Sequence, residues 1–285
     1  MKNVLSLPPL KFNCTKKIFH GGIFMFKRII TAAILFSLSA FPAFSHELTI
    51  KNTKGGVPEA GKTFELTVQS AHRFIVPEEV EILSRVKAGI IENGKLTESE
   101  LKANESELCI DFSVTPKDLS GSFIVTAIKD GESWCITNEG GKSGARKDLE
   151  AQGLKVISAN KYDKYAKAIF NTSKEDKNFA QVLGQPLEIV PVTNPADAKT
   201  GEYFDVKILL NGQPYTGPVW ASYDGFATEY ENTYAYYTEA ENGEAHIKIT
   251  APGWWGIRAA QSGLPGVEGD YDHLNLRAFL LFEVK

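Results

Sequence analysis

Short segments of alternating hydrophobic and polar residues cover most of the chain after residue 46. The first two, 48–50 and 64–68, place an apolar residue at every second position. A period of two puts these side chains on one face of a β-strand. If the loop 52–61, which contains three glycines, joins the two segments, they pair as an antiparallel hairpin with one core-facing side.

Four of the chain's Asn-Gly and Asp-Gly dipeptides separate later segments of the same kind. Both residues of such a dipeptide accept the left-handed backbone angles of tight turns between antiparallel strands. The dipeptides are Asn93-Gly94, Asp130-Gly131, Asn211-Gly212 and Asn242-Gly243. Each predicts a β-hairpin.

The rhythm changes between residues 140 and 184, where apolar residues recur at helical spacing. Asn160 is a candidate N-cap for this stretch. The recurring residues are Tyr162, Tyr165, Ala166, Ile169 and Phe170. Intervals of three and four residues place such side chains on one side of an α-helix, so we expect one substantial helix here.

These patterns predict an all-β protein with two β-sandwich domains, of immunoglobulin or transthyretin type, and one connecting helix. The predicted parts are a targeting segment (1–45), an N-terminal β-sandwich (46–145), a helical connector (146–184) and a C-terminal immunoglobulin-like β-sandwich (185–285). Each sandwich is long enough to bury a core of its own.

The first 45 residues have the composition of an export signal. The basic pair Lys27 and Arg28 precedes an uncharged, mostly apolar run (29–44), and Met25 is a candidate start. Ala43 and Ser45 place small residues at the two positions that a signal peptidase inspects, and cleavage after Ser45 would release a periplasmic chain. An uncleaved anchor is the alternative, although the run is short for a membrane span.

The segment 1–45 holds six basic residues and no acid, so its removal takes the formal charge from −4 to −10. An acidic surface argues against nucleic acid and anionic membranes as partners. A membrane contact is expected only through the targeting segment, if it stays uncleaved. Solubility alone also accounts for the charge.

His46 and His72 fall in step with the core-facing residues of the first two predicted strands. The hairpin would bring both imidazoles to one face at one end of the sheet. With the amine that cleavage exposes on His46, three nitrogens could hold Ni²⁺, Co²⁺ or Cu²⁺, which suit such ligands. The alternative is that the two histidines are half exposed and hydrogen-bonded to the backbone.

Asp272 and His273 open the last predicted strand and offer a carboxylate and an imidazole. They would complete the coordination sphere if this strand approaches His46, since carboxylates also orient histidine ligands. An exposed loop entering a strand is the alternative.

Cys109 and Cys135 are the cysteines that follow the predicted cleavage point. In an oxidising compartment they are candidates for one disulfide, and two reduced, buried thiols are the alternative.

Aromatic residues crowd the C-terminal part and suggest a second class of function. Rings in a row on a sandwich can stack on a glycan or a protein partner. The candidate residues are Trp220, Tyr223, Tyr237 and Trp254. Core packing is the plainer explanation.

No nucleophile and base stand at a recognised spacing, and no glycine-rich phosphate loop follows a strand. We therefore expect a binding protein rather than an enzyme.

The second half also carries a distinctive series of motifs: PLEIVP at 186–191, NP at 194–195, NGQP at 211–214 and APGWW at 251–255. Their order resembles a periplasmic protein family of poorly defined function, named for nickel uptake and described as a substrate-binding component of cobalt and nickel transport. His72 stands where members carry a histidine after the second strand. At 258–261, where many members have a further histidine, this chain has RAAQ.

The resemblance implies a periplasmic protein that binds nickel or cobalt and passes it to a membrane metal transporter. With the histidine pattern, it predicts a site of His46 and His72, with Asp272 and His273 as completing ligands. Copper suits the same ligands.

Overall fold

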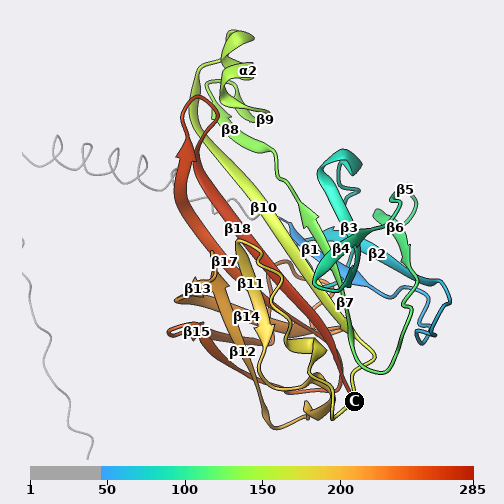
Figure 1. The fold of residues 1–285 in the computed structure, drawn as a ribbon. Helices are drawn as coiled ribbons and strands as arrows, with labels where there is room; N and C mark the ends of the chain where they lie inside the picture. The colour runs from blue at the N-terminus through green and yellow to red at the C-terminus, as the bar shows by residue number, and fades with distance from the viewer. Residues whose placement is uncertain (1–45) are drawn as a thin grey trace, which may run out of the picture. The chain divides into compact units, whose positions relative to one another are not determined.

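The computed structural model of the chain describes residues 46–285. The predicted targeting segment, the candidate start at Met25 and the cleavage point lie outside the described residues. Within 46–285 strands dominate, and one short α-helix, α2 (Arg146–Ala151), is present (Figure 1). Three single turns of 3₁₀-helix accompany it, at Leu83–Arg85, Asn178–Ala180 and Pro195–Asp197. The all-β fold class is therefore confirmed.

The strands form three sheets, which we call sheets I, II and III. Sheet I has the order β1 (Glu47–Lys51), β2 (Phe64–Ala71), β6 (Cys109–Val114), β5 (Lys102–Asn104). Sheet II has the order β15 (Tyr236–Ala240), β14 (Gly217–Tyr223), β17 (Gly253–Val267), β18 (Tyr271–Val284), β10 (Val156–Phe170), β7 (Phe123–Lys129), β3 (Val86–Glu92), β4 (Lys95–Glu98). Two further strands extend this sheet: β8 (Ser133–Thr137) pairs with β10, and β9 (Gly140–Ser143) pairs with β8. Sheet III contains β11 (Leu187–Pro191), β12 (Tyr203–Leu210), β13 (Gln213–Pro214) and β16 (Glu244–Lys248).

Strand β10 corrects the predicted helix. Its residues pair with β18 in parallel and with β7 antiparallel, so the strand is central in sheet II. Tyr165 and Ile169 enter one hydrophobic core, whereas Ala166 and Ala168 enter another. A strand buried on both faces is apolar at odd and even positions alike. Apolar residues of both parities therefore occur at intervals of three and four residues in β10, which is also the spacing of an amphipathic helix. The connector does hold a helix, but that helix is α2.

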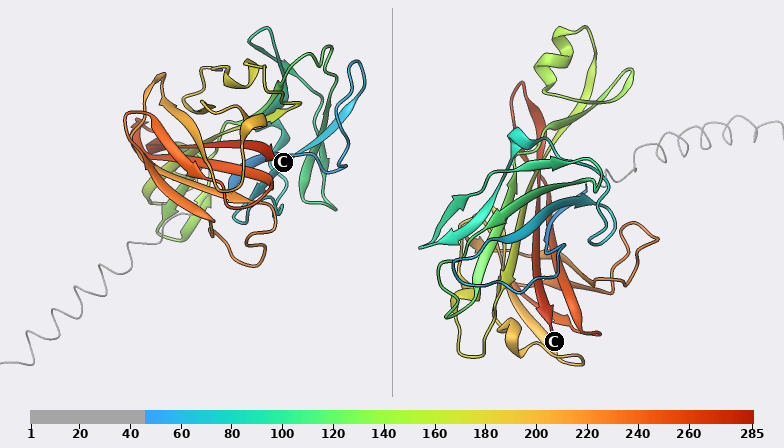
Figure 2. Two further views of the ribbon diagram at one scale, coloured as in Figure 1. Left: turned by 90° about the horizontal axis from the view of Figure 1, so that it is seen from below. Right: turned by 90° about the vertical axis from the view of Figure 1, so that its right-hand side faces the viewer.

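Two cores lie on opposite faces of sheet II. Odd-numbered residues of β10 join a core with sheet III, and its even-numbered residues join a core with sheet I. Figure 2 shows sheet I, in blue and green, lying across the long strands of sheet II. Sheet II takes strands from both predicted domains, and the described residues belong to one compact unit. The domain boundaries at 145 and 185 stay a prediction.

The turn dipeptides had different outcomes. Asn93-Gly94 and Asn211-Gly212 adopt positive φ at both residues and close the hairpins β3–β4 and β12–β13, as predicted. Asn242-Gly243 makes a tight turn with positive φ, but the strands it joins enter sheets II and III.

Asp130-Gly131 does not close a hairpin, because β8 pairs with β10 instead of β7. Gly131 is required for another reason: a Cβ atom there would lie 1.7 Å from the carbonyl oxygen of Tyr162. The glycine therefore permits a close approach of two backbones.

Candidate metal centre

Strands β1 and β2 form the predicted hairpin and bring two histidines together. Glu47 pairs with Ala71 at the end of the ladder, so His46 and His72 come next on either strand. Their ring centroids lie 3.9 Å apart. The core-facing residues Leu48 and Ile50 are buried, as the alternation predicted.

A third side chain, Glu78, reaches the two rings from the segment that follows β2. Its backbone N–H donates to the carbonyl of Ser70 at 3.0 Å, so the chain folds back beside the strand. Glu78 Oε2 lies 3.0 Å from His72 Nδ1 and 3.3 Å from His46 Nε2. We call His46, His72 and Glu78 the His46 group; each offers a ligand atom within 4.8 Å of the others.

The return of this segment depends on Ile75, which has a φ of +50°. A β-branched residue rarely adopts this conformation, which costs about 1–3 kcal/mol. Ile75 is also buried in the core beneath sheet I, and burial of its side chain offsets part of the cost. The chain thus accepts local strain at the turn that positions Glu78.

The spacing of the His46 group fits a small metal ion. Ligand bonds of about 2.0–2.1 Å in a tetrahedral arrangement place neighbouring ligand atoms about 3.3 Å apart. The two contacts of Glu78 Oε2, at 3.0 and 3.3 Å, are close to that value. The three side chains are 15–24% exposed, so solvent reaches the group and further coordination positions can open.

Neighbouring polar groups hold the carboxylates. Arg73 donates through Nε to Glu78 Oε1 at 2.9 Å and through its backbone N–H at 3.3 Å, so Oε2 is the oxygen that faces the imidazoles. Burial opposes ionisation of Glu78, but hydrogen bonds from Arg73 and His72 outweigh it and lower its pKa to about 2. The hydrogen bond with His46 likewise lowers the pKa of Glu79 to about 2. Both carboxylates are charged at neutral pH, which metal binding requires.

The beginning of β1 is also bound to sheet II. Glu47 accepts a hydrogen bond from Arg258 Nε and lies 3.8 Å from Arg277 Nε, and all three side chains are buried. The backbone N–H of Asn232 donates to the carbonyl of His72 at 3.0 Å. These contacts hold the histidine-bearing strand ends against sheet II and against the loop that joins its strands β14 and β15.

The structure does not bring Asp272 and His273 to the His46 group. They lie near the start of β18, where His273 is paired with Asn160 of β10. The Asp272 carboxylate accepts hydrogen bonds from Arg146 Nη2 at 2.6 Å and from the N–H of Ala159 at 2.8 Å. This carboxylate ties α2 and β10 to β18, and the predicted completion of the metal site by these residues is not supported.

Cys109 and Cys135 are not bonded to each other; both are free and buried. Cys109 lies in sheet I and Cys135 in sheet II, where the Cys135 thiol donates to the carbonyl of Gly144 at 3.3 Å. Of the two alternatives, the structure has the reduced, buried thiols.

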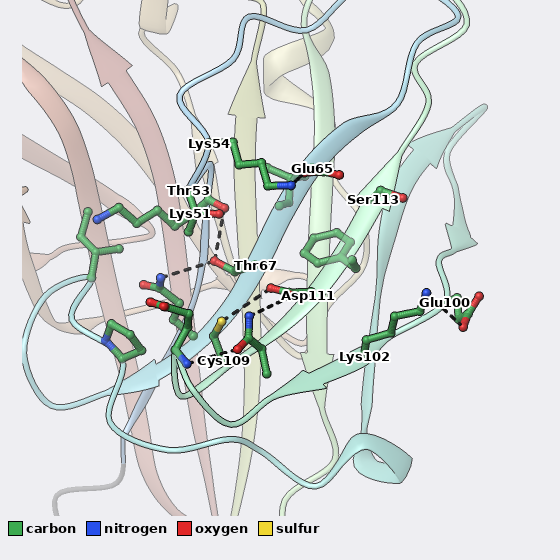
Figure 3. A pocket seen from close by; sticks show the side chains of 17 residues that line it. Lys51, Thr53, Lys54, Glu65, Thr67, Glu100, Lys102, Cys109, Asp111 and Ser113 are labelled. Atoms are coloured by element: carbon green, nitrogen blue, oxygen red, sulfur yellow. Dashed lines mark hydrogen bonds and ion pairs between the residues drawn. The ribbon is translucent and has the colours of Figure 1, made fainter.

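A cavity of about 760 Å³ opens over the outer face of sheet I (Figure 3). Cys109 and Asp111 lie on its floor, with lysine–glutamate pairs such as Lys54 and Glu65 along its side. Burial and Asp111 raise the pKa of Cys109 to about 11. The thiol is therefore protonated at neutral pH and is a poor nucleophile there.

The predicted aromatic face is largely occupied by packing. Trp220 stacks on Arg258, whose guanidinium lies 4.3 Å from the ring centroid, Tyr223 packs on Trp255, and Trp254 packs on Phe170. Tyr237 is 54% exposed. The binding of a glycan or protein partner by these residues stays a prediction.

Sequence reasoning did not find Glu78 or Glu79. The signal available was the pair of glutamates shortly after His72, in the run HRFIVPEE at 72–79. Periodicity ends at Ala71, and the turn that returns this segment follows no regular pattern.

Within residues 46–285, no helix is long and apolar enough to cross a bilayer. Fold and site together define an all-β protein with a candidate metal-binding group of two histidines and a glutamate.

The chain belongs to the family of the domain of unknown function DUF4198, whose profile matches residues 43–263. The match includes the whole His46 group. No curated protein matches the chain.

Proposed function

We propose that the protein binds a divalent transition metal, nickel or cobalt by preference, through His46, His72 and Glu78. The observation that carries the proposal is the position of one carboxylate oxygen within 3.0 and 3.3 Å of two imidazole nitrogens. Two nitrogens and one oxygen suit Ni²⁺, Co²⁺ and Cu²⁺, whereas Mg²⁺ and Ca²⁺ take oxygen ligands. The resemblance of the C-terminal motifs to a nickel-uptake family is the reason to propose nickel or cobalt among these.

The proposed role is capture of the metal in the periplasm and delivery to a membrane metal transporter, without catalysis. The export signal expected at 1–45 and the resemblance to nickel-uptake proteins support this role. A half-buried group with three protein ligands suits capture and release, because the remaining positions can be filled by water or by a partner's ligands. If cleavage follows Ser45, His46 also carries a free amine at the start of the chain.

Isothermal titration of the exported protein with Ni²⁺, Co²⁺ and Cu²⁺ tests the proposal, with Mg²⁺ as a control. We expect binding of one transition metal ion per chain, and loss of it in His46→Ala, His72→Ala and Glu78→Ala. His246→Ala is the matched control, because His246 is 62% exposed and pairs with Asp205 at 2.7 Å on sheet III. Equal affinity in all four variants, or no binding by the parent protein, would refute the site. Mass spectrometry of the periplasmic fraction would test the cleavage point.

A further inference from the structure

The two ring nitrogens of His46 have different neighbours. Nδ1 lies 2.9 Å from Glu79 Oε1, whereas Nε2 lies 3.3 Å from Glu78 Oε2. In a neutral imidazole one nitrogen carries the proton and the other has the lone pair that binds a metal. The partner of one nitrogen therefore decides which atom is left for the metal.

Glu79 is built to accept a proton from Nδ1. An isolated β-bridge joins Glu79 to Ser70 of β2. The Ser70 hydroxyl donates to Glu81 Oε1 at 2.8 Å and lies 3.3 Å from Glu79 Oε1. The positive charges of Lys129 and Lys164 also act on this carboxylate. Glu79 thus lies beside Nδ1, on the far side of the ring from Glu78, with a side chain that is 45% exposed.

We propose that Glu79 is a positioning residue of the metal site. It accepts the Nδ1–H of His46 and selects the tautomer whose Nε2 faces Glu78 and His72. The inference rests on the proposed metal binding and specifies which ring nitrogen of His46 binds the metal. A carboxylate that orients a histidine through the distal N–H is a common outer partner of metal ligands.

The contact between Glu79 and Nδ1 also decides whether the amine of a processed His46 can bind the metal. A histidine that chelates one metal through its own amine and its ring must use Nδ1, because Nε2 points away from the backbone. Here Nδ1 is engaged by Glu79. The site therefore forms through Nε2 whether or not the chain is cut after Ser45, and the amine is not required.

Two forms of the protein separate the two geometries: one that begins at His46 and one that keeps Ser45 in front of it. Titration with Ni²⁺ is expected to give the same dissociation constant for both forms within about twofold. A loss of tenfold or more on adding Ser45 would overturn the inference while leaving metal binding intact. Failure of both forms to bind would instead refute the proposed function.

Long-range ¹H–¹⁵N NMR with Zn²⁺ as a diamagnetic probe reads the ring nitrogens directly. We expect Zn²⁺ to shift Nε2 of His46 and to leave Nδ1 protonated; the opposite assignment would overturn the inference. Glu79→Gln should lower Ni²⁺ affinity by about 10–100-fold, the usual cost of losing such an outer partner. Glu98→Gln is the matched control, since Glu98 pairs with Lys87 on the exposed part of sheet II. Equal Ni²⁺ affinity in the two glutamine variants would also overturn it.

Discussion

The β1–β2 hairpin and the β17–β18 hairpin both place a histidine near acidic residues. In the first, Arg73 holds one oxygen of Glu78 and the other oxygen faces two imidazoles. In the second, one oxygen of Asp272 accepts hydrogen bonds from Arg146 and from the N–H of Ala159, and His273 pairs with Asn160 in the sheet. Both regions offer histidine and carboxylate side chains. What separates them is whether a carboxylate oxygen is directed at imidazole nitrogens or at the groups that hold the fold.

The largest expected difference is in metal affinity. His72→Ala should weaken Ni²⁺ binding by about 100-fold or more, beyond the loss expected for a supporting partner. His273→Ala should change it by less than about twofold, because His273 is not part of the His46 group. Calorimetric titration of both variants measures the contrast. A large effect of His273→Ala would mean that β18 contributes to the site after all.

The second difference is in stability. Asp272→Asn should lower the free energy of unfolding by about 1 kcal/mol, because it weakens the contacts to Arg146 and Ala159 at a partly exposed position. Metal affinity should not change. Urea unfolding with and without Ni²⁺ gives both quantities for one variant. A stable Asp272→Asn protein with weakened Ni²⁺ binding would reverse the assignment of the two hairpins.

A third effect concerns acid sensitivity beside the first hairpin. Burial would raise the pKa of Glu81, but Lys164 and Lys129 outweigh it and the pKa is lowered. A carboxyl group with a lowered pKa in the folded state stabilises the protein above its unfolded pKa of about 4.3. That contribution is lost as the pH falls from this value through the folded pKa.

Urea midpoints measured between pH 3 and 7 should therefore fall more steeply below about pH 4.5 in the parent protein than in Glu81→Gln. Glu81 is 6% exposed, so the variant is expected to be less stable at pH 7 as well. Parallel curves for the two proteins would contradict the role of this ion cluster.

The smallest effect concerns the buried thiols of the two regions, which should behave alike. Cys109 pairs with Gln69 of β2, and Cys135 packs in the small core that Tyr271 of β18 contacts. Burial raises the pKa of both thiols. Neither should react with a thiol reagent in the folded protein at pH 7, and both should react in urea. Labelling followed by mass spectrometry counts them, and a mass two protons short would reveal a disulfide.

Much of the first hairpin could be predicted, because its information is local. Alternation from Leu48 to Val68 fixes which side chains face the core, and the register then aligns His46 with His72. Glu78 could not be predicted in the same way. Its position depends on a left-handed Ile75 and on packing beneath sheet I, and neither leaves a period in the sequence.

The strand β10 shows the opposite limit. Its apolar residues were recognised, but their pattern has two meanings, and only partners far away in the chain decide between them. In the folded chain, backbone pairing with β7 and β18 makes this segment a strand. The role of Asp272 is hidden in the sequence for a related reason, because its partner Arg146 is 126 residues away along the chain.

The parallel pair of β10 and β18 also bears on when the protein can fold. Residues 160–168 pair with residues 273–281, so the middle of sheet II is incomplete until the last strand has been synthesised. Contacts of such long sequence separation form slowly, because the chain must first close a large loop. If the chain is exported unfolded, as the proposed function requires, this late closure of sheet II would delay folding until β18 is available to pair with β10.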